Sequence, residues 1–367
     1  MKIFMQTPKV FFASDEYTFA HLSYDGFLND EKGIFDLLKH GFLSSSIYTK
    51  LCNPSFIQKL YHEKHPGYMA FLSEFYSRFR DFDVIVMNPG VDLVHPEFLI
   101  KHFPNALKCL HFVDDPHLTY SYCFPFAWAF DCATYVSPSY SDQFTMSEIL
   151  SHAGLKEHRW TPHCITNNLN PPYTVEQLET QLLERENKAI YVGAFYTSKT
   201  KRLIEIKNQL GTNLDIFGRQ PFGGFIFPIM SSLSGFPSSY RVKQLSELQR
   251  ERLYEKYTVG LNMHLSHPAR ETGNARLYEL AYRGVAQVVD SSAHSAVSEI
   301  FKPEEEILLY ENTSECVAQV MKLLANKDLR VSIALQAYKR AIKEYSYQKV
   351  LNDTCGWFKH LLQAKAF

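Results

Sequence analysis

Two glutamates in the second half of this 367-residue chain flank the expected start of a helix. Glu271 and Glu279 lie eight positions apart, with Gly273 and Asn274 between them, where a helix can open closely against a ligand. Asn274 or Thr272 is the expected N-cap, since both residue types accept hydrogen bonds from the first helical turn. At about 1.5 Å per residue, the two carboxylates are separated along the helix by at most about 12 Å. Each can accept hydrogen bonds from hydroxyl groups of a ligand that spans this distance.

The start of this helix also suits an anion. Its free N–H groups and the positive end of its dipole can hold a diphosphate. A nucleoside diphosphate sugar fits such a site, with its ribose hydroxyls on Glu279 and its sugar on Glu271. The alternative that this spacing leaves open is an amphipathic helix with one solvated glutamate and one glutamate in the preceding loop.

Basic residues follow two further predicted strands. Gly193 ends the strand expected at 189–192, and Lys199 and Arg202 come next in the following helix. Arg219 stands directly after another expected strand. Cations at the ends of strands can neutralise a diphosphate leaving group, because charge develops there as the bond breaks. Solvated basic turns are the alternative.

Acidic residues end a buried strand in the first half of the chain. Asp114, Asp115 and His117 follow the apolar run at 107–113. A carboxylate at this position can act as the general base for a hydroxyl group. The alternative is an ordinary turn, because Asp before Pro favours turns.

Strands, polar turns and helices alternate along the chain, which is typical of parallel α/β sheets. An Asn- and Pro-rich stretch within 166–188 is the expected boundary between two halves. We therefore predict an N-terminal α/β domain over 1–170, a second over 186–345 and a terminal helix within 346–367. The strands expected in the two domains are 1–6, 83–87, 107–113 and 132–136, and then 189–192, 214–217, 258–263, 286–289 and 307–310. Ligands of such sheets bind at the carboxyl ends of the strands, so two domains can share a cleft that holds two substrates.

Composition narrows the function classes. The chain is 46% hydrophobic and 21% charged, which excludes a disordered protein. Its 38 basic and 39 acidic residues give a net charge of −1, so binding to nucleic acid is not expected. The 7 cysteines are scattered without a C-x-x-C pair, which is typical of reduced thiols and does not predict a metal site. No membrane span or signal peptide is apparent. We expect a cytoplasmic protein, with peripheral contact to the inner face of a membrane left open.

The segment from Glu271 to the strand at 286–289 resembles the E-x7-E segment of retaining glycosyltransferases of group 1, which have the GT-B fold. Glu271, Glu279 and Gly284 match the pattern of that family. The CgeB-like branch also has an arginine in this segment, matched by Arg276. It further has an Asp-x-Pro after a strand of the first domain, matched at 114–116. The chain departs from the common Gly-Phe-Gly after the first glutamate, since Thr-Gly-Asn stands there.

The resemblance implies two facing Rossmann-like domains and a C-terminal helix that crosses back to the first. It implies transfer of a sugar from a UDP-, GDP- or TDP-linked donor on the second domain to a glycan, lipid or protein hydroxyl on the first. No cofactor or metal is required, and the sugar's configuration is retained. Glu279 matches the ribose-binding residue and Glu271 the donor-sugar residue. Two alternatives remain: an inverting enzyme with Asp114 or Asp115 as base, and a non-catalytic binding module of the same fold. A dehydrogenase is not favoured, because no G-x-G-x-x-G follows a strand.

Overall fold

The computed structural model of the chain describes residues 1–6, 18–22, 62–66, 69–70, 73, 77, 81–87, 96–112, 124–138, 144–163, 172–194, 197–219, 245–264, 273–291 and 297–365. The chain divides into two compact units. Unit 1 comprises Met1–Pro162 and Leu351–Phe367, and unit 2 comprises His163–Val350.

Unit 1 is built on a six-stranded sheet with the order β2-β1-β3-β4-β5-β6. Every neighbouring pair of these strands runs parallel. Strands β3, β4 and β5 are buried along their whole length, as the apolar runs in the sequence predict. The elements described in unit 1 are β1 Lys2–Gln6, β2 Thr18–Leu22, β3 Val84–Met87, α6 Pro96–His102, β4 Leu107–Phe112, η1 Phe124–Ala129, β5 Cys132–Tyr135, α8 Met146–His152 and β6 His158–Trp160.

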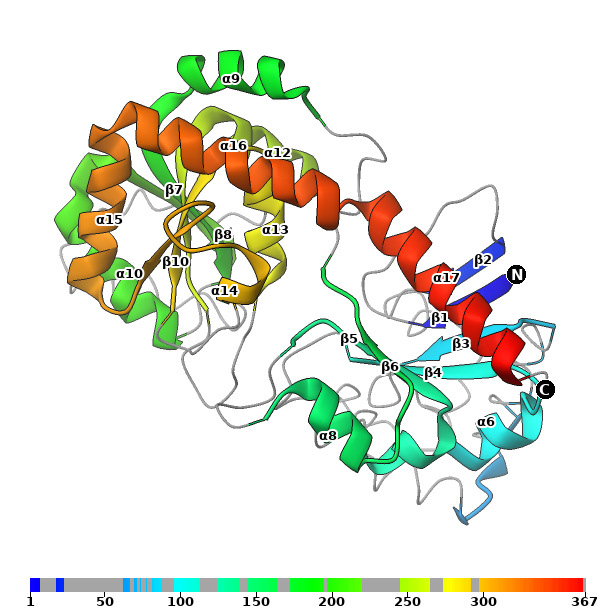
Figure 1. Cartoon of the computed structure of the whole chain (residues 1–367). Helices are drawn as coiled ribbons and strands as arrows, with labels where there is room; N and C mark the ends of the chain where they lie inside the picture. The colour runs from blue at the N-terminus through cyan, green and yellow to red at the C-terminus, as the bar shows by residue number, and fades with distance from the viewer. Residues whose placement is uncertain are drawn as a thin grey trace. The chain divides into compact units, whose positions relative to one another are not determined.

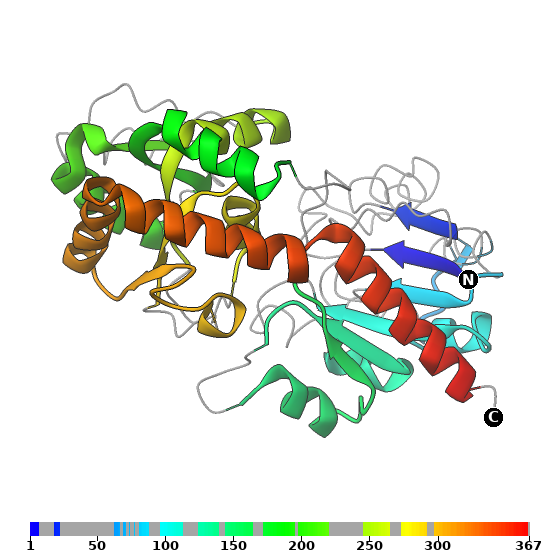
Figure 2. The same cartoon turned by 45° about the horizontal axis from the view of Figure 1, so that its top comes forward.

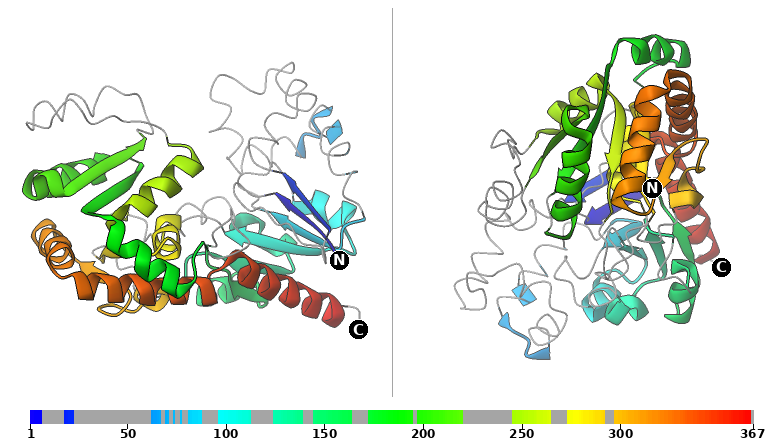
Figure 3. Two further views of the ribbon diagram at one scale, coloured as in Figure 1. Left: turned by 90° about the horizontal axis from the view of Figure 1, so that it is seen from above. Right: turned by 90° about the vertical axis from the view of Figure 1, so that its left-hand side faces the viewer.

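Unit 2 is built on a five-stranded sheet with the order β11-β10-β9-β7-β8, again with parallel pairs throughout. Its helices cover both faces of the sheet (Figure 1; Figure 3). The elements described in unit 2 are α9 Val175–Glu184, β7 Glu186–Ala194, α10 Thr197–Leu210, η2 Gly211–Asn213, β8 Leu214–Arg219, α12 Glu247–Lys256, β9 Tyr257–Asn262, α13 Ala275–Tyr282, β10 Ala286–Asp290, α14 Val297–Ile300, β11 Leu308–Tyr310, α15 Thr313–Ala325 and α16 Lys327–Glu344. These two sheets confirm the prediction of two α/β units, each built on a parallel sheet.

The two faces of the unit 2 sheet belong to two separate hydrophobic clusters, because side chains alternate along each strand. Tyr191 of β7 packs into the larger cluster together with α10, α15 and α16. Its neighbours Ile190 and Val192 pack into the smaller cluster with Tyr254 of α12 and Leu280 of α13. Helices α12 and α13 therefore cover one face, and α10, α15 and α16 cover the other.

The strand order of unit 2 creates a switch point. The chain passes from β7 to β8 on one side, and β9 then pairs with the opposite edge of β7 before β10 and β11 continue outward. In open parallel sheets, ligands bind at the carboxyl ends of the two strands where the direction changes. In this fold, a ligand site is expected at the ends of β7 and β9, at Ala194 and Asn262.

The last helix, α17 Tyr347–Lys365, begins in unit 2 and continues into unit 1. Only Tyr345 and Ser346 separate it from α16, which it follows directly in Figure 2. Within unit 1 its buried face carries Leu351, Cys355 and Phe358, at helical spacing.

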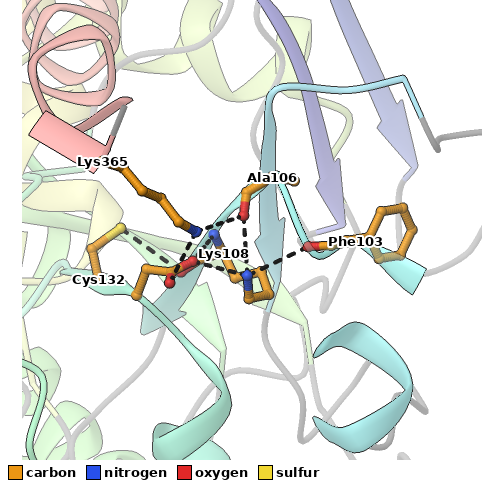
Figure 4. A network of polar contacts seen from close by, with 6 residues as sticks. Phe103, Ala106, Lys108, Cys132 and Lys365 are labelled. Atoms are coloured by element: carbon orange, nitrogen blue, oxygen red, sulfur yellow. Dashed lines mark hydrogen bonds and ion pairs between the residues drawn. The ribbon is translucent and has the colours of Figure 1, made fainter. Parts of the chain in front are cut away.

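The end of α17 is tied to the amino-terminal edge of the unit 1 sheet. Lys365 donates to the carbonyl oxygen of Ala106 at 3.3 Å and forms an ion pair with Asp131 at 3.2 Å. Asp131 also pairs with the buried Lys108 at 3.1 Å (Figure 4). Burial raises the pKa of the Asp131 carboxyl, but the Lys108 N–H and the Lys108 and Lys365 charges outweigh that effect, so the net pKa is lowered.

Several elements differ from expectation. The sequence did not predict strands β2 and β6 or helix α12. Helix α12 begins at Glu247, inside the stretch 221–248, whose Gly and Ser residues favour a long loop. Most of that stretch lies outside the described residues. Helix α12 is mainly polar and starts with a capping box in which Ser246 accepts from the Gln249 N–H. None of the described helices is long and apolar enough to cross a membrane.

Candidate donor site at the carboxyl end of the unit 2 sheet

Helix α13 begins beside the switch point. Asn274 is its N-cap and accepts a hydrogen bond from the Leu277 N–H, which confirms one of the two expected caps. The Asn274 amide also donates to Oδ1 of Asn262 at the end of β9, at 2.9 Å. Gly273 precedes the cap with a φ of 111°, a conformation that side chains strongly disfavour. A Cβ there would also lie 2.6 Å from Ile300 Cδ1, so only glycine fits this entry into the helix.

Arg276 extends from the first turn of α13 to the end of β7. Its guanidinium lies over the ring of Tyr191, with the central carbon 4.9 Å from the ring centroid. One of its terminal nitrogens, Nη1, donates to Oδ1 of Asn262 at 3.1 Å. A cation is thus held at the point where β7, β9 and the start of α13 meet.

Glu279 lies on the same side of α13, three positions after Arg276, and its side chain is 23% exposed. Its Oε1 forms an ion pair with Nη2 of Arg250 at 2.9 Å, and its Oε2 accepts from the hydroxyl of Tyr254 at 3.4 Å. Burial, followed by the nearby charge of Glu279, raises the pKa of Tyr254, so this hydroxyl stays protonated and remains a donor. A carboxylate has about four lone-pair positions, so two further hydroxyl groups can still bind to Glu279.

The basic residues at the start of α10 lie in a different setting. Arg202 forms an ion pair at 2.8 Å with Asp290, whose side chain is fully buried at the end of β10. The Arg202 guanidinium also lies 5.8 Å from the centroid of the Tyr310 ring. Burial lowers the pKa of Arg202, but the charge of Asp290, the hydrogen bond that it accepts from Arg202 and the nearby Tyr310 together outweigh burial, so the net pKa is raised. Lys199, one turn earlier, is buried.

Several predicted site residues fall outside the described part of the chain. Glu271 precedes the first described residue of the α13 segment, and Asp114, Asp115 and His117 follow β4 beyond its last described residue. Arg219 is described only in its backbone, where it pairs with Ala194 of β7. Its position still places it at the carboxyl edge of the sheet, beside the end of β7.

Four residues that contact the candidates were not found from the sequence: Tyr191, Asn262, Arg250 and Tyr254. The position of Asn262, at the end of a predicted strand, is the one local signal among them. Tyr191 reads as a core residue in an apolar strand, and Arg250 and Tyr254 belong to the unpredicted α12. Among the described residues, no group of His, Cys, Asp and Glu side chains is placed to hold a metal ion.

Comparison with known proteins gives the same architecture. Residues 200–356, which include α13, match the family described as "Glycosyl transferase-like". Curated protein sequences give no significant match. Many solved structures resemble the chain, at low sequence identity.

Three of these structures illustrate the resemblance. TarM from S. aureus, in complex with UDP, α-GlcNAc-glycerol and Fondaparinux, shares 12% identity with a TM-score of 0.58, and the match covers 79% of this chain but only 58% of TarM. HepE from Anabaena, in complex with UDP, shares 12% identity with a TM-score of 0.60 over 98% of this chain and 100% of its own. A glycosyltransferase from Rickettsia africae shares 12% identity with a TM-score of 0.59 over 98% of each chain.

The family match lies in unit 2 and the start of α17, and the structural matches extend over both units. The two parallel α/β sheets agree with the GT-B fold that the sequence predicts. Residues 200–356 thus match a glycosyl transferase-like family, and the chain as a whole has the GT-B fold.

Proposed function

We propose that this protein transfers a sugar from a nucleoside diphosphate sugar, bound by unit 2, to a hydroxyl group of a glycan, lipid or protein acceptor. The observation that carries this proposal is that Arg276 and Glu279 lie on one side of α13, at the switch point of the sheet. A guanidinium and a helix N-terminus suit phosphate oxygens, and a carboxylate suits a pair of vicinal hydroxyls. A nucleoside diphosphate has both groups in one molecule.

In this proposal, Glu279 accepts hydrogen bonds from the ribose hydroxyls. Arg276 and the N–H groups behind the Asn274 cap bind the diphosphate, and Glu271 binds the donor sugar. Gly193, near the end of β7, leaves room for the Arg276 guanidinium. UDP is the nucleotide we expect first, because the structures of TarM and HepE with similar folds contain it.

The reaction follows from these positions. The bond between the anomeric carbon and the diphosphate oxygen breaks, the acceptor oxygen forms a bond to that carbon, and negative charge develops on the departing diphosphate next to Arg276. Cations placed there stabilise the leaving group more as its charge grows. We propose retention without a metal ion, in which a donor phosphate oxygen takes the proton of the acceptor hydroxyl. In the alternative, Asp114 or Asp115 takes that proton and the configuration inverts.

Thermal unfolding with added nucleotides tests donor binding. At a concentration of about 100 times Kd, a bound nucleotide adds about 2.7 kcal/mol of stability, which raises Tm by several degrees. We expect UDP, GDP, TDP or ADP to produce this shift in the wild type and Glu279→Ala to abolish it. Glu305→Ala is the matched control, because Glu305 is an exposed surface residue whose contact with Lys302 is long, at 3.5 Å. No shift with any of the four nucleotides would contradict the proposal.

Product analysis then tests the transfer itself. With a donor and an acceptor that support release of nucleoside diphosphate, NMR of the anomeric proton distinguishes retention from inversion. The proposal expects retention and unchanged turnover in excess EDTA. A protein that binds the nucleotide but never releases nucleoside diphosphate from a donor is a binding module instead, and this outcome refutes the enzymatic proposal.

A further inference from the structure

The guanidinium of Arg276 is held by residues of two strands rather than by its own helix. The aromatic ring of Tyr191 on β7 lies beneath it, at 4.9 Å from ring centroid to central carbon. Asn262 on β9 accepts a hydrogen bond from Nη1 at 3.1 Å. A cation within about 6 Å of an aromatic face is attracted to it, and this attraction grows when water is excluded. Tyr191 and Asn262 are both fully buried, so their own positions are fixed by packing.

Gly193 provides the space that the guanidinium occupies. A Cβ on this residue would lie 2.1 Å from Nη2 of Arg276 and 2.9 Å from its central carbon. Such distances do not occur between non-bonded atoms, so any side chain at position 193 displaces Arg276. The same Cβ would lie 2.8 Å from the Tyr191 hydroxyl. The observed pose of Arg276 is therefore compatible only with glycine at this position, and the reason is the space that the arginine and the ring occupy rather than the backbone conformation.

The contacts of Arg276 also connect the two faces of the sheet. Tyr191 belongs to the cluster on the α10 and α15 face. Asn262 lies between Leu261 and Met263, which both belong to that same cluster, so strand alternation places Asn262 on the α13 face. The arginine thus bridges the carboxyl edge of the sheet between β7 and β9, where a ligand of this fold binds.

We propose that Tyr191, Asn262 and Gly193 are positioning residues that hold Arg276 in one pose before the donor binds, so that its guanidinium meets the diphosphate without reorganisation. This inference rests on the proposed function. A long side chain that is already ordered loses less conformational freedom on binding. A guanidinium held in a fixed orientation can donate two parallel hydrogen bonds to phosphate oxygens. Asn262 accepts a hydrogen bond from one of the five N–H groups of the guanidinium. This bond and the Tyr191 ring beneath it restrict the orientation of the guanidinium plane.

Nucleotide titration calorimetry tests the role of Gly193. We expect Gly193→Ala to weaken UDP binding about 10- to 100-fold, the loss typical of a hydrogen-bonded charge contact. UMP should lose less, and uridine binding should not change, because the effect is on the diphosphate. Gly356→Ala is the matched control, since a Cβ at Gly356 in α17 meets no atom within 4 Å. It should bind UDP as the wild type does.

A double-mutant cycle distinguishes positioning from a general disturbance of β7. If Gly193 acts through Arg276, then Gly193→Ala adds no further loss of UDP affinity to Arg276→Met. Tyr191→Phe keeps the aromatic face and should bind UDP more tightly than Tyr191→Leu. The Tm of every variant is measured in parallel, and the comparison uses only variants that unfold cooperatively.

The outcomes separate the two proposals. If the wild type binds no nucleotide, the proposed function fails and this inference fails with it. If the wild type binds UDP but Gly193→Ala binds it equally well, or if the losses from Gly193→Ala and Arg276→Met simply add, the positioning role is overturned and the proposed function stands.

Discussion

At the scale of single residues, Arg250 has the clearest role beyond the E-x7-E segment. It reaches from α12 to Glu279, and its Nη2 lies 2.9 Å from Oε1 of that carboxylate. The hydroxyl of Tyr254, one turn later on α12, contacts the other carboxylate oxygen at 3.4 Å. These two contacts fix the plane of the carboxylate and direct its remaining lone pairs. We infer that Arg250 orients Glu279 for the ribose.

Replacement of Arg250 by methionine tests this role. We expect Arg250→Met to weaken UDP binding about fivefold, which corresponds to about 1 kcal/mol. Calorimetry with UDP and 2′-deoxy-UDP gives the informative readout. The wild type should prefer UDP, and the preference should shrink in the variant because its carboxylate is no longer held in one plane.

Arg252→Met is the control, because Arg252 is exposed on the same helix. It should leave both affinities unchanged. A preference for UDP that is the same in Arg250→Met and the wild type would show that Arg250 contributes only to packing between α12 and α13.

At the scale of elements, the end of α13 explains the glycine that follows the second glutamate of the segment. Gly284 has a φ of 63°. Its N–H donates to the Ala281 carbonyl at 2.9 Å, and the Val285 N–H donates to the Leu280 carbonyl at 2.9 Å. These two bonds form a Schellman motif, whose left-handed position favours glycine. Leu280 and Val285 also pack in one hydrophobic cluster, as this motif often requires.

Gly284→Ala is expected to destabilise the protein by about 2 to 4 kcal/mol. Two costs contribute: the left-handed backbone, and a Cβ that would lie 2.5 Å from Cδ1 of Leu178 on α9. Chemical denaturation of the variant and the wild type measures the sum.

Gly211→Ala separates the two costs. Gly211 also has a left-handed φ, of 56°, but a Cβ there meets no atom within 4 Å. It should lose about 1 kcal/mol, the backbone contribution alone. Equal losses at both glycines would contradict the packing contribution of Leu178.

At the scale of the whole molecule, the chain returns to its first unit through α17. Residues Leu351–Phe367 belong to unit 1, although more than a hundred residues of unit 2 separate them in sequence from the rest of it. The ion pairs of Asp131 with Lys108 and Lys365 tie the end of the helix to the sheet. Arg159 of β6 also contacts Asp353 of α17 at 3.5 Å.

Asp131→Asn should lower the stability of unit 1 by about 2 kcal/mol at neutral pH. The reason is that the buried Lys108 ammonium loses its nearest opposite charge. The three tryptophans, Trp128, Trp160 and Trp357, all lie in unit 1, so tryptophan fluorescence during denaturation reports on this unit.

The pH dependence of this effect has a definite sign. Because the pKa of Asp131 is lowered in the folded protein, its contribution to stability is present above the unfolded value of about 3.9. It is lost as the pH falls through the lowered value. The difference in stability between wild type and Asp131→Asn should therefore shrink below about pH 4. A constant difference down to pH 2 would contradict the assignment.

Much of the fold follows from local patterns in the sequence. Buried strands such as β3, β4 and β9 are short apolar runs with turn residues at their ends, and these patterns need no tertiary information. The terminal helix predicted within 346–367 corresponds to α17, Tyr347–Lys365. Strand β6 was missed because its sequence, His-Arg-Trp, carries no apolar run.

The candidate site could be predicted only in part. Asn274 as cap and Glu279 on the exposed side of α13 follow from the segment itself, since helical periodicity assigns faces. Arg202 illustrates the limit. Its place at the start of α10 suggests a phosphate contact, but its Asp290 partner lies 88 positions away in the sequence.

The sequence by itself determined that this protein has parallel α/β units, a capped helix that carries the second glutamate, and a segment that resembles the E-x7-E motif of group 1 glycosyltransferases. Each of these depends on residues within one element or one turn. Only the tertiary structure decided that β9 lies beside β7 rather than beside β8, and this order brings Asn262, Tyr191 and Gly193 around Arg276. Periodicity defines the faces of an element but not its neighbours. Which elements become neighbours depends on the burial of whole faces against one another. This packing brings the guanidinium of Arg276 to the switch point, beside Tyr191 and Asn262.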